Sequence, residues 1–144
     1  MLNVSNLFAG YGESVALHGI SFSTKKNETV AIMGRNGMGK STLFKSLIGA
    51  LPIRSGSIKV GEFDISGDES YQRVGRGLAY VPQGRMIFPT LTVLENIETG
   101  LEFSEDKTVP EEIYELFPVL YDMRSRKGGN LSGGQQQQLA IARA

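Results

Sequence analysis

The string "GRNGMGKS" at residues 34–41 has the residue types and spacing of a loop that binds phosphate. It fits G-x-x-x-x-G-K-[ST] and lies between an apolar run and a stretch of helical period. Its glycines let backbone N–H groups converge on phosphate oxygens, the lysine reaches the β- and γ-phosphates, and the serine hydroxyl ligates Mg²⁺. The alternative, a glycine-rich turn with a surface lysine, leaves the strand–loop–helix context unexplained. The pattern therefore predicts a nucleoside triphosphate site, formed by Gly34, Arg35, Asn36, Gly37, Met38, Gly39, Lys40, Ser41 and Thr42.

A second candidate site is the string "LSGGQ" at residues 131–135, which opens a run of four glutamines. Ser132 and Gln135 have the spacing of a capping box, so a helix is expected to begin there. The two glycines between them, Gly133 and Gly134, expose backbone N–H groups at the positive end of that helix. The pattern predicts an anion site that has no lysine of its own.

Short apolar runs predict the strands that position these loops. Residues 2–7 and 15–24 alternate between apolar and polar, and the second run changes phase at Gly19, which indicates a β-bulge. The continuous apolar runs "TVAIMG" and "LAYV" are typical of strands buried on both faces. "GSIKVGE" returns to alternation and predicts an edge strand.

Apolar residues at helical spacing and capping signals predict the helices. The stripe in "STLFKSLIGAL" follows the phosphate loop and ends at Pro52, and "LTVLENI" opens with the capping-box pair Thr92 and Glu95. "PEEIYELF" places Pro110 and two acids at a helix start. Further helices are expected at "DESYQRVGR" and from Ser132. Helices that alternate with strands, behind an antiparallel front, predict an α/β fold.

Composition narrows the class of protein. The 144 residues include 15 basic and 15 acidic side chains and no cysteine. A balanced charge gives no bulk field that attracts nucleic acid or an anionic membrane, and without cysteine there is no disulfide, iron–sulfur cluster or cysteine zinc site. The apolar runs are too short to span a membrane, and the N-terminus lacks the pattern of a signal peptide. The chain is therefore expected to be cytosolic and to meet a membrane only through another protein.

The motifs together resemble those of the ATP-binding-cassette family. Tyr11, the phosphate loop, "YVPQ" at 80–83 and "LSGGQ" at 131–135 occur in the order and spacing of that family, and "LSGGQ" before a helix is its signature. The resemblance covers the whole chain. It implies a P-loop NTPase core with an antiparallel β subdomain over residues 1–84, and a helical subdomain with the signature over 85–144, without the C-terminal half of the family's domain.

The resemblance also implies roles for individual residues. Tyr11 would stack on adenine, although a strand-end tyrosine packed on the core is the plainer interpretation. Gln83 would contact Mg²⁺, with Ser41, and the attacking water. The catalytic residues would be Lys40, Gln83 and Ser132. The signature residues would close over the γ-phosphate of ATP on the opposite subunit of a head-to-tail dimer; they are Ser132, Gly133, Gly134 and Gln135.

Other features narrow the choice of cassette. "YVPQGRMIFPTLTVLENI" resembles importers of branched-chain amino acids and amides, and the four-glutamine run resembles the ATP-binding subunit of urea importers. Urea or a short amide is the first expectation and branched-chain amino acids the second. Met86, Ile87 and Phe88 form either an exposed patch for a permease helix or part of the interior. His18 lies before the phosphate loop and is expected to be a surface or packing residue without a catalytic role.

The expected partners follow from the resemblance: a second ATP-binding subunit, permease subunits in the cell membrane, a periplasmic solute-binding protein indirectly, and no nucleic acid. The chain would lie on the cytoplasmic face of that membrane and use ATP and Mg²⁺. The family's Asp-Glu pair and switch histidine follow the signature helix and are not in this sequence. Little turnover of ATP and exposed apolar surface at "TVAIM" and "LAYV" are therefore expected. The alternatives are a binding module that does not hydrolyse ATP and a cassette ATPase outside transport.

Overall fold

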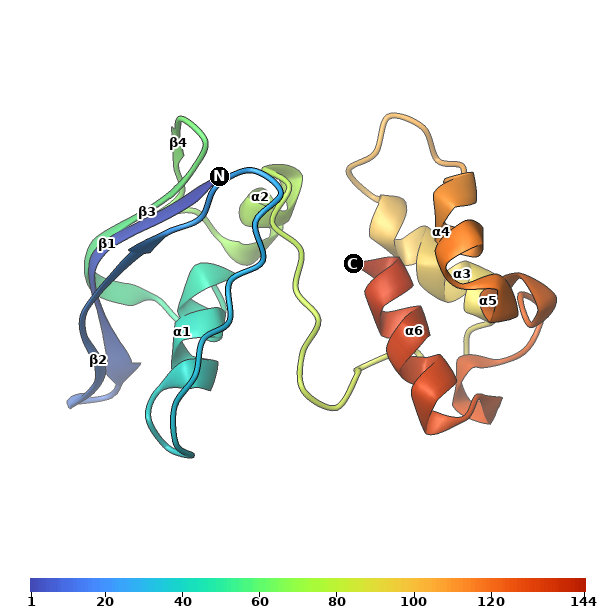
Figure 1. Cartoon of the computed structure of the whole chain (residues 1–144), viewed down its shortest axis with the longest axis horizontal. Helices are drawn as coiled ribbons and strands as arrows, with labels where there is room; N and C mark the ends of the chain where they lie inside the picture. Colours follow the sequence, from blue (N-terminus) through green and yellow to red (C-terminus); the bar gives the residue numbers. More distant parts are fainter. The chain divides into compact units, whose positions relative to one another are not determined.

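The computed structural model describes all 144 residues, and these form two compact units, residues 1–78 and 79–144. The first unit contains all the strands and two helices, and the second unit contains only helices and connecting segments (Figure 1). The two candidate sites fall in different units, with the phosphate loop in the first and the signature in the second.

The first unit is built on an antiparallel sheet of four strands in the order β2-β1-β3-β4. The strands are β1 (Leu2–Tyr11), β2 (Ser14–Ser23), β3 (Ile53–Val60) and β4 (Phe63–Asp64). The strand predicted at "GSIKVGE" is present as part of β3, but it does not lie at the edge. The two-residue strand β4 pairs with Lys59 and Val60 and covers that side.

The predicted bulge in β2 is confirmed. Leu7 pairs with Ile20, whereas Ala9 pairs with Leu17, so β2 carries one more residue than β1 between these pairs. Gly19 lies in that interval with a φ of 70°, a conformation that glycine adopts without the steric penalty of other residues. The bulge explains why the apolar alternation of the sequence changes phase at this glycine.

Helix α1 (Lys40–Leu47) packs against β1 and β2, where the apolar core of this unit lies (Figure 1). The predicted stripe is only partly correct, because Leu43 and Leu47 are buried but Phe44 is 41% exposed. Helix α2 (Ser70–Gly75) forms within the predicted polar segment. The buried core residues of the unit are Val4, Leu7, Ala9, Leu17, Leu43, Leu47, Ile58 and Ile65.

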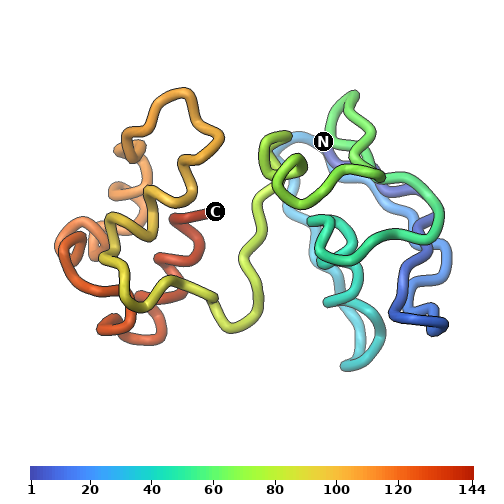
Figure 2. The backbone as a smooth tube through the Cα atoms, turned by 180° about the vertical axis from the view of Figure 1, so that it is seen from behind, coloured from blue at the N-terminus to red at the C-terminus, as the bar shows by residue number.

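The prediction of strands at "TVAIMG" and "LAYV" is wrong for this structure. Residues 29–34 and 78–81 run as extended chain without strand pairing, and Figure 2 shows the first segment leading into the loop before α1. A strand needs a neighbouring strand that accepts and donates its backbone hydrogen bonds, and neither segment belongs to the sheet. Val30 is consequently 44% exposed, Met33 91% and Tyr80 37%, so the expected exposure of apolar surface is confirmed.

The second unit packs short helices around its own apolar core. The helices are α3 (Val93–Glu98), η1 (Thr99–Leu101), α4 (Glu111–Leu116), α5 (Pro118–Asp122), η2 (Gly128–Asn130) and α6 (Gly133–Arg143). Their buried core residues are Val93, Ile97, Leu120, Leu131, Leu139 and Ala142. The helix starts predicted at Thr92, Pro110 and Ser132 are confirmed, since each of these residues is an N-cap. None of the helices combines the length and the hydropathy that crossing a membrane takes.

The capping box of α3 gives this unit a predictable response to acid. The Thr92 N–H donates to Glu95 Oε2 at 2.7 Å, and the Thr92 hydroxyl donates to the same oxygen at 2.8 Å. The backbone bond first, and then the hydroxyl bond, lower the pKa of Glu95 below its ordinary value. The stabilisation is therefore fully present above the pKa of the unfolded chain and is lost as pH falls through the lower pKa of the folded state.

The urea concentration at which half of this unit is unfolded should fall as the pH is lowered. In Glu95→Gln this fall is expected to be smaller, because an amide oxygen accepts the Thr92 bonds at any pH. Urea unfolding at a series of acidic pH values, followed by helical circular dichroism, measures the slope. Glu98→Gln, in the same helix but outside the capping box, is the matched control. Equal slopes for wild type and Glu95→Gln would contradict the prediction.

Candidate functional site

The phosphate loop is a tight turn between the extended segment and α1 (Figure 2). Gly37 has a φ of 83° and Gly39, the N-cap of α1, a φ of 87°, so both lie in the left-handed region. Gly39 is also close to β2, since a Cβ atom there would lie 3.0 Å from Leu17 Cδ2 and 3.1 Å from the Ala16 carbonyl oxygen. A larger residue at this position would push the loop away from the sheet that supports it.

Lys40 folds back over its own loop. Its Nζ donates to the Gly34 carbonyl at 2.6 Å and to the Arg35 carbonyl at 2.8 Å. These neutral oxygens hold the ammonium group of Lys40 at the mouth of the loop. Residues 34–38 of the loop are exposed. A triphosphate arriving there would meet a cation that exchanges two carbonyl contacts for stronger charge-assisted ones.

The start of α1 supplies further donors. The first backbone bond of the helix runs from the Leu43 N–H to the Gly39 carbonyl at 2.8 Å. The N–H groups of Lys40, Ser41 and Thr42 precede it and have no acceptor within the helix, and the helix dipole adds positive potential. Thr42 is buried, so this residue has only its backbone N–H to offer an anion. Ser41 is exposed, and its hydroxyl is accessible to a cation.

Tyr11 lies at the end of β1, with its side chain 50% exposed, so it is not the core residue that the plainer interpretation expected. Lys45 of α1 approaches it, with Nζ 5.9 Å from the ring centroid. The structure thus brings Tyr11 and α1 of the phosphate loop to one region of the first unit. An aromatic ring beside a triphosphate site is suited to stacking on a base.

The chain offers few groups to a divalent cation. No group of three or more His, Asp or Glu side chains in the structure is arranged to hold a metal ion. A Mg²⁺ ion at the phosphate loop would therefore be held by the Ser41 hydroxyl, phosphate oxygens and water, a set of oxygen ligands that suits this ion. Gln83, the other predicted metal ligand, is exposed and belongs to the second unit, whereas Ser41 belongs to the first.

The signature forms the start of α6, the longest helix. The Ser132 N–H donates to Gln135 Oε1 at 2.9 Å, and the Gln135 N–H donates to Ser132 Oγ at 3.4 Å, which closes the predicted capping box. Gly133 and Gly134 are exposed, so their N–H groups face solvent at the positive end of the helix. The predicted helix start at the signature is present.

Sequence reasoning missed the residues that surround this helix start. Arg85 Nη1 donates to Gln136 Oε1 at 2.9 Å, and Arg143 Nη1 donates to the Met86 carbonyl at 2.9 Å. The four-glutamine run has a structural role besides its resemblance to urea importers, because its first two members make specific hydrogen bonds. The arginine was visible in the motif "YVPQGR", but its partner lies 51 residues away and only the folded chain reveals it.

The sequence leaves two alternatives for residues 86–88, an exposed patch or part of the interior, and the structure shows some of each. Met86 is 69% exposed and Phe88 46% exposed, whereas Ile87 packs against the core of the second unit. His18 is exposed on β2, as expected, and takes no part in either site.

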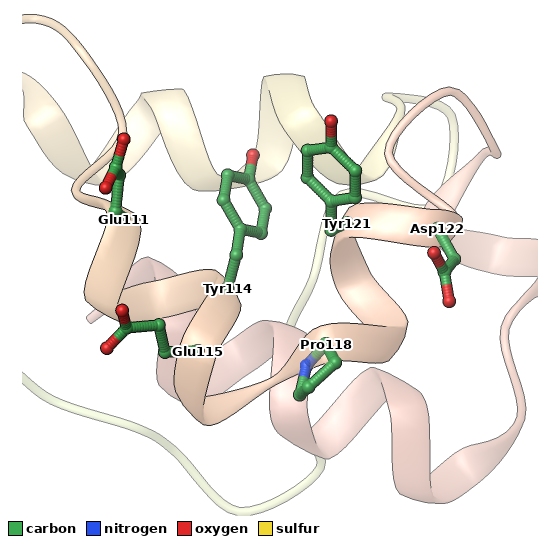
Figure 3. Close-up of a pocket in the computed structure, with 6 residues that line it drawn as sticks. All are labelled: Glu111, Tyr114, Glu115, Pro118, Tyr121 and Asp122. Atoms are coloured by element: carbon green, nitrogen blue, oxygen red, sulfur yellow. The ribbon is translucent and has the colours of Figure 1, made fainter.

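A separate hollow on α4 and α5 is unsuited to a nucleotide (Figure 3). The rings of Tyr114 and Tyr121 stand next to each other there, with centroids 5.3 Å apart and planes at 75°. The remaining lining includes the carboxylates of Glu111, Glu115 and Asp122. Three carboxylates repel a triphosphate, so the chemistry of the phosphate loop has no counterpart at this surface.

Comparisons with known proteins identify the family of this chain. Residues 17–144 match the family described as ABC transporter. The chain therefore belongs to the ABC transporter family and carries its ATP-binding domain. The resemblance in the sequence is confirmed at this level.

Two curated relatives are transport proteins by name. A high-affinity branched-chain amino acid transport ATP-binding protein of Pseudomonas aeruginosa is 39% identical over 147 residues, covering 100% of this chain and 63% of the relative. A probable branched-chain amino acid transport ATP-binding protein of Archaeoglobus fulgidus is 37% identical, covering 100% of this chain and 62% of the relative. The chain thus spans less than two thirds of the length of these relatives, and neither is named for urea.

The fold is confirmed by a solved structure. A dimeric ATP-binding cassette in a post-hydrolysis state, bound to ADP and Pi, superimposes with a TM-score of 0.82 at 26% identity. The match covers 99% of this chain and 68% of that one. The chain accordingly has the cassette fold, with its antiparallel sheet and its helices.

Proposed function

We propose that this chain is the nucleotide-binding part of the ATPase subunit of an importer. The observation that carries the proposal is Lys40, whose ammonium group lies at the mouth of a glycine loop and at the positive end of α1. A cation, free helix N–H groups and an exposed serine hydroxyl at one place are suited to the phosphates of MgATP.

Different residues of the first unit bind different parts of MgATP in this proposal. Lys40 turns from the Gly34 and Arg35 carbonyls to the β- and γ-phosphates, and the N–H groups of residues 40–42 bind phosphate oxygens. Tyr11 stacks on the adenine. Mg²⁺, when bound with ATP, would supply positive charge to the phosphates, and the Ser41 hydroxyl is the group of this unit that would hold it.

The second unit is proposed to act on the nucleotide of another subunit. The start of α6 at Ser132 would accept the γ-phosphate of ATP that a second copy binds, in a head-to-tail dimer. Gln83 would contact the ion and the attacking water. The dimeric relative with ADP and Pi supports a dimer of this kind, because it shares the fold of this chain.

The functional domains are proposed as an ATP-binding part over 1–84 and a helical part over 85–144. The assembled protein would hydrolyse ATP at the cytoplasmic face of the cell membrane, where it binds permease subunits. A solute-binding protein would deliver the solute to these permease subunits. Met86 and Phe88 are exposed and apolar, which suits contact with a permease. The 144 residues by themselves are proposed to hydrolyse ATP slowly, because the groups that bond to Lys40 at the phosphate loop are carbonyls and not carboxylates.

The names of the two relatives support branched-chain amino acids as the transported solutes. Urea or a short amide remains the alternative, supported by the resemblance of the four-glutamine run. Neither site described above contacts a transported solute, so the permease decides between them.

Equilibrium binding of MgATP, followed by a phosphate-release assay, tests the proposal. MgATP is expected to bind at one site per chain, and the release of phosphate is expected to be slow. The control is inorganic triphosphate with Mg²⁺, which lacks the base that Tyr11 would stack on and is expected to bind more weakly than MgATP. A chain that binds neither compound would contradict the proposal.

A further inference from the structure

The segment that follows Gln83 adopts an uncommon backbone conformation. Arg85 has a φ of 69° and Met86 a φ of 49°, directly after Gly84 with a φ of 86°. Residues other than glycine rarely adopt positive φ, and they keep it only where surrounding contacts impose it. The question is which contacts hold this turn and what else they hold.

Two arginines tie the turn to α6. Arg85 Nη1 donates to Gln136 Oε1 at 2.9 Å, near the start of the helix, and Arg143 Nη1 donates to the Met86 carbonyl at 2.9 Å, near its end. The guanidinium group of Arg143 also lies 5.2 Å from the centroid of the Phe88 ring. The turn is therefore bound to α6 at both ends of the helix.

Gln136 stands at the centre of these contacts. While its Oε1 accepts from Arg85, its Nε2 donates to the Leu131 carbonyl at 3.2 Å and to the Gly128 carbonyl at 3.4 Å. Its backbone N–H donates to the Ser132 carbonyl at 2.9 Å, which is the first bond of α6. One side chain thus connects the turn, the chain before the signature and the signature helix.

Arg85 also lies against the signature itself. A Cβ atom at Gly133 would lie 3.2 Å from Arg85 Nη1, so the guanidinium group is packed over that glycine. Further along, the Gly128 N–H donates to the Leu91 carbonyl at 2.8 Å and the Gly129 N–H to the Pro89 carbonyl at 3.0 Å. The chain after Gln83 and the chain leading into the signature are bonded side by side.

We propose that Arg85 and Gln136 are positioning residues that fix the start of the signature helix relative to the turn after Gln83. The inference rests on the proposed function, in which the start of α6 binds the γ-phosphate on a second copy of the chain. With the Arg85–Gln136 bond in place, the N–H groups of Gly133 and Gly134 are presented in one orientation. Without it, the helix start is free to shift, and closure on the second copy weakens.

The test separates this role from general stability by measuring two properties of the same 144-residue chain. MgATP affinity, measured by equilibrium dialysis, reports the phosphate loop of the first unit. MgATP-dependent self-association, measured by sedimentation velocity, reports the signature. The variants are Arg85→Met, Gln136→Met and the double variant, with Gln136→Glu as the conservative change that keeps an acceptor for Arg85. Arg124→Met is the matched control, since the Arg124 side chain donates to the Tyr121 carbonyl and packs on the Tyr121 ring.

Arg85→Met is expected to weaken MgATP-dependent association about tenfold, the effect of one lost hydrogen bond to a charged group. Gln136→Met should weaken association at least as much, because it also removes the two Nε2 bonds, and the double variant should be no weaker than Gln136→Met. Gln136→Glu should associate more strongly than Gln136→Met, because it keeps the acceptor for Arg85, and Arg124→Met should associate like the wild type. MgATP affinity should remain within about twofold throughout, since the phosphate loop is untouched.

Normal association of Arg85→Met, or losses that multiply in the double variant, would overturn the inference. A wild-type chain that binds MgATP without associating would overturn it as well, while the proposed function fails separately if the wild-type chain does not bind MgATP. Should Arg85→Met not fold, Arg85→Lys is compared with Arg124→Lys. Weaker association of Arg85→Lys alone supports the inference, because lysine lacks the fork of donors, and equal association of the two overturns it.

Discussion

Replacing Lys40 with alanine is expected to weaken MgATP binding at least about hundredfold, which corresponds to about 2.7 kcal/mol of binding free energy. The ammonium group already binds the carbonyls of Gly34 and Arg35, and a triphosphate would provide stronger acceptors at the same place. Hydrogen bonds to charged groups each contribute about 1.5–3 kcal/mol, so losing two of them accounts for the effect. Equilibrium dialysis with labelled ATP measures it.

The matched control for this prediction is Lys26→Ala. Lys26 is an exposed lysine in the turn after β2, so its removal changes the net charge equally and leaves the loop intact. Circular dichroism should show the same helix and strand content for both variants, because the Lys40 ammonium group bonds to carbonyls of its own loop and to no other element. Affinity retained in Lys40→Ala would mean that MgATP binds elsewhere.

Arg73→Met is expected to lower the free energy of unfolding of the first unit by about 3 kcal/mol or more, because buried acceptors left without a partner cost about 1–3 kcal/mol each. Arg73 is 2% exposed. Its Nη1 donates to the carbonyls of Ser46 and Leu47 at 2.7 and 2.8 Å, which are the last carbonyls of α1. The same guanidinium group donates to the carbonyls of Asp68 and Ser66 at 2.8 and 3.2 Å.

Burial also lowers the pKa of Arg73, while the nearby carboxylates of Asp68 and Glu69 raise it. The residue nevertheless stays charged, since the guanidinium group of arginine is effectively always protonated in proteins. A cation at the C-terminal end of α1 interacts favourably with the negative end of the helix dipole. The loss in Arg73→Met therefore includes an electrostatic contribution as well as the hydrogen bonds.

Urea unfolding followed by circular dichroism measures this loss. Arg76→Met is the control, because the Arg76 side chain is 45% exposed and lies 4.0 Å from Asp68 in a surface ion pair of small expected effect. Arg73→Lys is expected to destabilise nearly as much as Arg73→Met, since one ammonium group cannot reach four carbonyls on separate segments. A midpoint for Arg73→Met equal to that of the wild type would contradict the role of the residue.

Local features of the sequence determined the parts of this protein that depend on neighbours along the chain. The phosphate loop at 34–41, the bulge at Gly19 and the capping boxes at Thr92 and Ser132 are all present as predicted. Each depends on residues a few positions apart, because glycine conformation, caps and helix dipoles act within one or two turns. The same local patterns led to the family.

Only the tertiary structure decided the features that depend on distant partners. Residues 29–34 and 78–81 have strand-like sequences but remain unpaired, because a strand forms only where another backbone supplies its hydrogen bonds. Arg73 and Arg85 looked like ordinary surface arginines in the sequence. The fold buries the first beneath α1 and bonds the second to Gln136, and contacts across 26 and 51 residues have no local signal to reveal them.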